Sequence, residues 1–432
     1  MTAEITVMNK MAIAMAADSA MTITPARGEK KIYNTVNKLF ALSKYDPVGI
    51  MVFDNAEIMG VPWETVIKSY RKFLGKTGFA TLEEYGRHFV EFFEKENIYF
   101  PPAQQEEYFK HMTSLSFYQI RHQIKNKLDD LVKEQKEVSV IEIEGITASI
   151  ISITHDSLVK KDRLPNFPAS FSDQLLTKYS GVIEDRKAAI LEKLPLTNEA
   201  HDQLRRISVE IFSRDYFIDS LSGVVIAGFG EKEIFPSTRS YTFEGIIENR
   251  LKHRLDKHRA VTHDVDAYVI PFAQTDMVFA FIEGVDPNYN EFTIKAGRFL
   301  LRRFSETILD KVEIMDAEAK AKLAKLLGTT RDDLGNTFSE MLGHHRQENY
   351  TEGVMNAVGL LPKDELAAMA ESLVNLTVFK HKVSMSAETV GGAVDVAVIT
   401  KGDGFIWIKR KHYFKPELNP QFVSNYLRLD ED

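Results

Sequence analysis

Cysteine is absent from this chain of 432 residues. Without thiols the protein has no disulfides, no zinc–thiolate or iron–sulfur site and no cysteine nucleophile. No window holds ~18 uninterrupted apolar residues, so we expect neither a transmembrane helix nor a membrane partner. The first residues also lack the basic segment, apolar run and cleavage site of a signal peptide, and we therefore expect a cytoplasmic protein.

The chain also has no excess of positive charge, because its 54 Lys and Arg are outnumbered by 62 Asp and Glu, which gives a net charge of −8. This balance argues against general nucleic-acid binding. The short basic run at residues 409–412 is interpreted as a solvated strand end. His344 and His345 are adjacent and would point in different directions on a helix, so we predict no metal site there. No cofactor is expected.

The length predicts two or three domains, or one domain with large insertions. Residues 4–17 alternate between apolar and polar residues or run apolar, end at Asp18 and predict strands, as do the runs 37–43 and 48–53. Pro62 is expected to open a helix through WETVIKSYRKFL, and Gly75 to end it. Strands followed by a helix make up the first part of the predicted core.

The middle and C-terminal parts alternate between helical and strand patterns. Within residues 78–195, amphipathic helices are expected to flank a β-rich piece at 138–155, VSVIEIEGITASIISITH. Asn198 is expected to cap the next helix. Strands are then predicted in SGVVIAGFG and DAYVIPFA, a polar helical segment over 311–361, and a helix opened by Pro362. Two last strands are expected in VDVAVITKGDGFIWIK.

Thr2, Asp18 and Lys38 form the candidate catalytic set. Methionine aminopeptidases remove Met1 before a small residue such as Thr2, which would leave threonine first. A first-position threonine carries its own base, because a free α-amine has a pKa near ~8 and can accept the hydroxyl proton. A nearby lysine lowers the pKa of that amine, and an aspartate can hold the lysine.

The stretches MTAEITVMNKMAIAMAADSAMT and TVNKLF together resemble the start of a proteasome β-type subunit, an N-terminal nucleophile hydrolase. The resemblance implies that Thr2 is the nucleophile, Asp18 its acidic orienter and Lys38 the catalytic lysine. It also implies that the backbone of Thr22 pairs with the substrate. The implied fold is α+β, a four-layer αββα sandwich with two largely helical insertions.

Other positions match the family less closely. The backbone amide near Phe53 would receive the oxyanion, Thr275 would supply a hydroxyl given by serine in the family, and Gly391 belongs to a matching Gly-Gly pair. Ala387 and Val390 stand where the family has aspartate and serine. These two departures indicate either a changed proton relay or a damaged site.

The resulting expectation is a discontinuous core over residues 1–77 and 196–432, with insertions at 78–195 and 311–361. The expected function is amide hydrolysis by Thr2, most plausibly of peptide or protein substrates, in a homo-oligomer. The 78–195 insertion is a candidate surface for a protein partner. Two alternatives stay open: an acylase or amidase acting on a small molecule, and a non-catalytic interaction protein that kept the fold.

Overall fold

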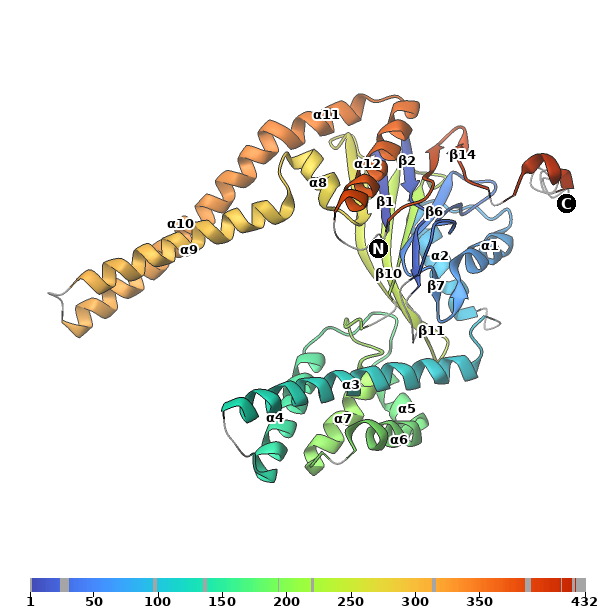
Figure 1. Ribbon diagram of the computed structural model, residues 1–432. Coiled ribbons are helices and arrows are strands. Elements are labelled where there is room, and N and C mark those ends of the chain that lie inside the picture. Colours follow the sequence, from blue (N-terminus) through green and yellow to red (C-terminus); the bar gives the residue numbers. More distant parts are fainter. Residues whose placement is uncertain are drawn as a thin grey trace. The chain divides into compact units, whose positions relative to one another are not determined.

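The computed structural model describes residues 2–23, 31–95, 99–134, 138–192, 194–218, 221–312, 316–384, 390–412, 414–421 and 424. The chain divides into two compact units. Unit 1 comprises residues 1–39, 234–236 and 260–432, and unit 2 comprises residues 40–233 and 237–259. Figure 1 shows the helices and strands of both units.

Unit 1 contains a five-stranded sheet in the order β12-β1-β2-β13-β14. Its strands are β1 (Ala3–Asn9), β2 (Ala12–Ala17), β12 (Ala267–Ala273), β13 (Asp395–Thr400) and β14 (Gly404–Lys409). Each neighbouring pair in this sheet is antiparallel. All residues of β1 and β2 are buried, which explains why β2 is a continuous apolar run and why β1 is apolar except at Glu4, Thr6 and Asn9. A small hairpin of β3 (Met21–Ile23) and β4 (Lys31–Tyr33) follows.

Helix α12 (Lys363–Val383) covers this sheet by packing its apolar side on β1, β2 and β13 (Figure 1). Pro362 precedes it and Asp364 and Glu365 lie in its first turn, as the sequence predicts. The other helical elements of unit 1 are α8 (Asp276–Glu283), α9 (Pro287–Lys311), α10 (Ala317–Arg346), the π-helical η1 (Gln347–Thr351), α11 (Glu352–Leu360) and the 3₁₀ turn η2 (Pro416–Leu418).

Unit 2 contains the second five-stranded sheet, in the order β11-β10-β9-β6-β5. Its strands are β5 (Leu39–Ala41), β6 (Val48–Asp54), β9 (Ser222–Gly228), β10 (Ser237–Ile247) and β11 (Arg250–Ala260). Helices α1 (Trp63–Leu74) and α2 (Leu82–Lys95) pack on one face through a cluster of aromatic rings centred on Trp63. The short pair β7 (Glu57–Ile58) and β8 (Val61–Pro62) leads into α1.

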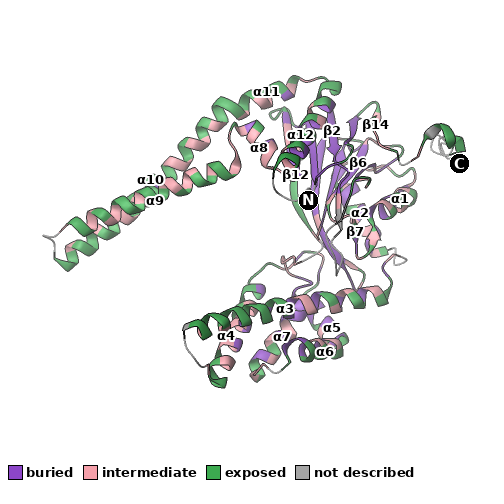
Figure 2. Ribbon diagram, in the orientation of Figure 1, coloured by how far each residue is buried: buried purple, intermediate pink, exposed green. Residues whose placement is uncertain are grey.

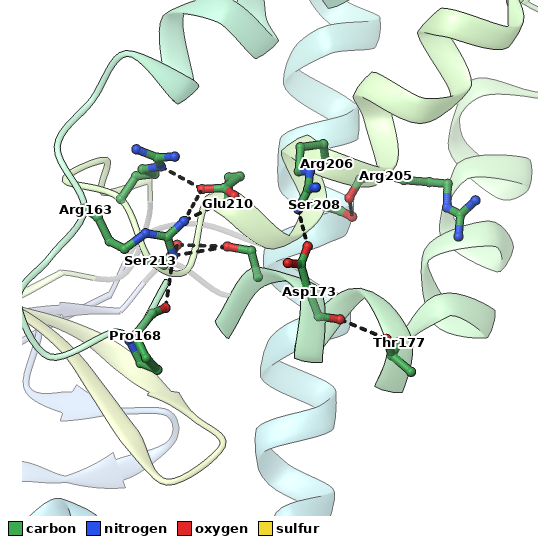
Figure 3. A network of polar contacts seen from close by, with 11 residues as sticks. Arg163, Pro168, Asp173, Thr177, Arg205, Arg206, Ser208, Glu210 and Ser213 are labelled. Carbon is green, nitrogen blue, oxygen red and sulfur yellow. Dashed lines mark hydrogen bonds and ion pairs between the residues drawn. The ribbon is translucent and has the colours of Figure 1, made fainter. Parts of the chain in front are cut away.

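A helical group completes unit 2 with its own apolar core. It consists of α3 (Pro102–Glu134), α4 (Val140–Val159), α5 (Phe171–Lys178), α6 (Ser180–Leu191) and α7 (Asn198–Glu210). The buried Glu210 at the end of α7 accepts from Arg163 at 3.3 Å and from Arg214 at 2.6 Å. Arg163 also donates to Ser213 at 3.0 Å, so this network ties the segment after α4 to α7 (Figure 3).

Two local predictions are wrong. Residues 138–155 do not form strands, because Val140–Val159 is one helix whose buried Thr147, Ile151 and Leu158 lie at helical spacing. Ser139 and Glu142 form a reciprocal capping box at its start, which satisfies free backbone N–H groups. The cap of α7 is Thr197, whose hydroxyl accepts from the Ala200 amide, and not Asn198.

The fold is therefore mixed α and β with antiparallel sheets, in agreement with the coarser part of the prediction. The four-layer arrangement stays a proposal. The division into a family core and two insertions also stays a prediction, because contacts within one chain do not define a family core. No helix within the described ranges is both long and apolar enough to cross a membrane.

Candidate functional site

The β1–β2 hairpin returns Asp18 to the start of β1. Its register places Ala17 opposite Glu4, so the next residue, Asp18, lies beside Ala3. The Asp18 amide donates to the Ala3 carbonyl at 3.1 Å, and the Ala3 amide donates to Asp18 Oδ1 at 3.2 Å. Thr2 and Asp18 are both buried. Two residues that the sequence singled out thus meet through ordinary strand pairing.

Lys38 brings the positive charge to this cluster. Its Nζ lies 2.5 Å from Asp18 Oδ1 and 3.3 Å from Glu4 Oε1, and the side chain is almost wholly buried. A buried ammonium is stable only when carboxylates or other acceptors replace its water. The predicted pairing of Lys38 with Asp18 is therefore present. The catalytic role of Lys38 stays a prediction.

The Gly391–Gly392 segment holds the other side of Asp18. The Gly391 amide donates to Asp18 Oδ2 at 2.9 Å, and its carbonyl accepts from the Ser19 amide at 3.0 Å. Gly392 has φ +80°, and a Cβ there would lie 2.8 Å from the Asn34 carbonyl oxygen. Only glycine fits this turn without strain. Because the Gly391 amide is bound to Asp18, it orients the carboxylate instead of facing a substrate.

Glu4 belongs to the site although the sequence did not single it out. Burial raises the pKa of the Glu4 carboxyl to about 8, and the nearby Asp18 carboxylate adds to the rise. The Lys38 ammonium and the Thr2 side chain oppose it. A carboxyl with this pKa is largely protonated at pH 7 and can give or take a proton near pH 8. The sequence feature that could have identified Glu4 is an isolated acidic residue within a predicted strand, two residues after Thr2.

Thr275 and Thr22 both lie in unit 1, at the start of α8 and on β3. Thr275 occupies the N-cap position of α8, but its side chain makes no capping hydrogen bond. The preceding Gln274 donates its backbone amide to the Thr2 carbonyl at 3.2 Å, which places Thr275 one residue from a direct contact of Thr2. The backbone of Thr22 pairs with Ile32 of β4.

The remaining candidates are not brought to this cluster by any described contact. Phe53 lies on β6 in unit 2, where its ring covers Gly223 of β9. Val390 is buried in the apolar core of unit 1, so it supplies no polar group. Ala387 lies outside the described residues. Within the ranges that the structure covers, no group of three or more His, Asp or Glu side chains is arranged to bind a metal ion.

Comparison of the chain with protein families, curated proteins and solved structures gives no match.

Proposed function

We propose that this protein is a threonine-nucleophile amide hydrolase, most plausibly a peptidase, in which Thr2 becomes the first residue. The observation that carries the proposal is the buried Lys38–Asp18 pair, bonded directly to Ala3, the residue after Thr2. A cation and a carboxylate are costly to bury together, and a plain turn does not need them. Cleavage before Thr2 is required, because the α-amine of Thr2 has to be free to act as the base.

In the proposed reaction the Thr2 hydroxyl oxygen attacks the substrate carbonyl carbon, and the Thr2 α-amine accepts the hydroxyl proton. The C–N bond of the tetrahedral intermediate breaks, and the same proton passes to the departing amine. An ester between Thr2 and the acyl group remains. Water then attacks this ester, the α-amine again acts as base, and the acid product leaves with the hydroxyl restored.

Lys38 and Glu4 would tune these proton transfers. A positive Lys38 near the α-amine keeps the pKa of that amine low enough for it to act as a base at neutral pH. Asp18 holds the lysine in place, and the Gly391 amide holds Asp18. Glu4, with a pKa of about 8, would be a further proton-carrying group within reach of Lys38. No step requires a metal or an organic cofactor.

The test combines intact mass, N-terminal sequencing and labelling with an epoxyketone that reacts with an N-terminal threonine. We expect a natural protein that begins at Thr2 and carries one label on that residue. Thr2→Ala should abolish labelling, whereas Thr2→Ser should keep it. A protein that retains Met1 in full, or takes up no label, would exclude this mechanism and favour a non-catalytic interaction protein. Labelling combined with activity on small amides alone would favour the acylase alternative.

A further inference from the structure

Helices α9 and α10 lie side by side as a long hairpin (Figure 1). Gly297 of α9 lies against the Phe338 ring of α10, and Arg298 donates to Asn336 at 3.4 Å. No residue of α9 is buried, and Gly335 is the only buried residue of α10. Figure 2 shows both helices in exposed and intermediate colours along almost their whole length. The polar side chains of the hairpin are therefore in contact with solvent.

Three arginine side chains line one cavity of this hairpin. The cavity has a volume of about 320 Å³, which is in the size range of small-molecule sites. Arg298 and Arg302 are four residues apart on α9, so their side chains lie on the same side of that helix. Helix α10 supplies the remaining lining residues, which are Arg331, Asp332, Gly335 and Asn336. We call this space the arginine cavity.

Gly335 makes room for the arginine cavity. A Cβ at this position would lie 3.4 Å from Cγ of Arg298 and 3.7 Å from its Nε. The stem of Arg298 therefore crosses α10 directly over the glycine, and a long side chain at residue 335 would take up space in the cavity. The next residue, Asn336, accepts from Nη2 of Arg298 at 3.4 Å, which holds this guanidinium at the cavity wall.

The lining of the cavity carries an excess of positive charge. Its three arginines stand against one carboxylate, that of Asp332, which leaves a net charge of +2. The two helices together have the same sign, because their ten Lys and Arg outnumber seven Asp and Glu, whereas the whole chain has a net charge of −8. A concave site with charge of one sign attracts small ions of the opposite sign.

Two of the arginines already have carboxylate partners, but both pairs are exposed. Arg302 pairs with Glu306 at 2.9 Å, and Arg331 pairs with Asp332 at 2.9 Å. All four side chains are at least 35 % exposed, and ion pairs of this kind contribute little to stability. A guanidinium has five N–H donors, more than one carboxylate contact uses. An anion of higher charge can therefore bind the same guanidinium groups.

We propose that the arginine cavity binds a phosphate group, either as free phosphate or as the monoester of a small molecule. A phosphate monoester carries about −1.5 to −2 charges at pH 7, which matches the net charge of the lining. Its oxygens accept paired hydrogen bonds from guanidinium groups. A carboxylate has a single charge and would leave one positive charge of the lining uncompensated. The proposal goes beyond hydrolysis at Thr2, since every lining residue lies on α9 or α10.

The test is isothermal titration calorimetry of the full-length protein at low ionic strength, where charge interactions are least screened. The probes are inorganic phosphate and glycerol phosphate. We expect Arg298→Ala and Arg331→Ala each to weaken binding at least ~10-fold, as loss of a charge-assisted hydrogen bond does. Arg303→Ala is the matched control, because it removes the same charge next to Arg302 but from outside the lining. It should leave the affinity unchanged.

A second pair of variants tests the cavity without changing any charge. Gly335→Leu keeps all three arginines and fills the space beside Arg298, so it should weaken phosphate binding at least ~10-fold. Gly328→Leu on the same helix is its control, since nothing lies within 4 Å of the added Cβ. Leucine favours a helix more than glycine does, so both variants should keep α10. Circular dichroism checks this.

Three results would overturn the proposal. The first is a parent protein that gives no binding heat with either probe at ~1 mM. The second is equal weakening by Arg303→Ala and Arg298→Ala, which would reduce the effect to general charge attraction. The third is unchanged binding in Gly335→Leu, which would show an adventitious ion only. Tighter binding of glycerol phosphate would support a phosphorylated small molecule as the ligand, and tighter binding of inorganic phosphate would support the free ion.

Discussion

At the residue scale, the site is a buried cluster in which two carboxylates share one ammonium. Asp18 has the closer contact with Lys38 and also accepts from three backbone amides, those of Ala3, Ala20 and Gly391. Glu4 lies farther from Lys38 at 3.3 Å and is fully buried. Burial is the largest cause of the raised pKa of the Glu4 carboxyl, and the Asp18 carboxylate adds to the rise.

Glu4→Gln should change how stability depends on pH. The folded-state pKa of about 8 exceeds the ordinary 4.5, so the folded protein keeps a proton that the unfolded chain releases between these values. The contribution of Glu4 is thus fully present below pH 4.5 and is lost as pH rises through 8. Urea unfolding across this range should show a smaller fall in the free energy of unfolding for the variant. Equal slopes would show that Glu4 is ionised in the folded state.

Lys38→Ala should abolish turnover and reduce labelling of Thr2, with a loss of more than ~100-fold, typical of removed acid–base help. The reason is that the ammonium holding the pKa of the Thr2 amine down would be gone. Lys68→Ala is the matched control, because Lys68 forms an exposed pair with Glu64 on α1. Hydrolysis of a fluorogenic peptide measures both variants. Activity retained by Lys38→Ala would limit Lys38 to a structural role.

At the scale of single elements, hydrophobic periodicity and the proline and glycine residues at helix ends predicted most of the helices and strands. Helix α1 lies between Pro62 and Gly75 as expected, and α12 begins after Pro362. The prediction of strands was wrong at α4. The alternation of isoleucine with polar residues was given more weight than the helix-capping pair Ser139 and Glu142. Packing against α3 and α7 stabilises that helix, and such contacts are not visible in a local pattern.

Site prediction has the same limit. Asp18 and Lys38 could be found because their spacing from Thr2 resembles a known arrangement. For Glu4 the sequence offers only an isolated acidic residue in a strand, because its importance comes from its own burial and from its distance to Lys38. The binding of the Gly391 amide to Asp18 likewise joins residues almost the whole chain apart.

Gly223→Ala tests the contact between β6 and β9. A Cβ at this position would lie 2.0 Å from the ring of Phe53, so the ring must leave its place over the sheet. We expect a loss of ~1–3 kcal/mol in the free energy of unfolding, as overpacking does. Gly402→Ala is the control, since nothing lies within 4 Å of its added Cβ; its effect should stay within ~0.5 kcal/mol. Similar urea midpoints for both variants would contradict the described packing of Phe53.

At the scale of the whole molecule, the 78–195 segment and the α9–α10 hairpin differ in how far their side chains belong to an apolar core. Phe89 and Phe93 of α2 pack on Trp63 and Phe243, so the start of the 78–195 segment is part of the unit 2 core. The α9–α10 hairpin, in contrast, buries almost nothing. The sequence predicts an insertion in both cases, whereas the two segments differ in how many of their side chains are buried.

Replacing residues 291–345 with a short Gly/Ser linker should therefore leave a folded protein. Arg346 hydrogen-bonds Asn290, so the two ends of the cut lie side by side and a short linker can join them. Replacing 78–195 in the same way should prevent folding, because it strips α2 from its sheet. Thermal unfolding followed by circular dichroism compares the two. A cooperative transition in the second protein, or none in the first, would contradict this assignment.

The position of β1 inside its sheet has a consequence for synthesis on the ribosome. Ala3 pairs with Ala273, and Ala17 pairs with Asp395, so β1 has both of its neighbours only after Ala273 has been made, and β2 only after β13 has been made. At ~5–20 residues per second, the interval between Ala17 and Asp395 lasts roughly 20–80 s. Through that time β1 and β2 can pair with each other, but the outer edge of β2 has no partner strand and is open to association with other chains. The cluster of Glu4, Asp18 and Lys38 can close only after Gly391 has emerged.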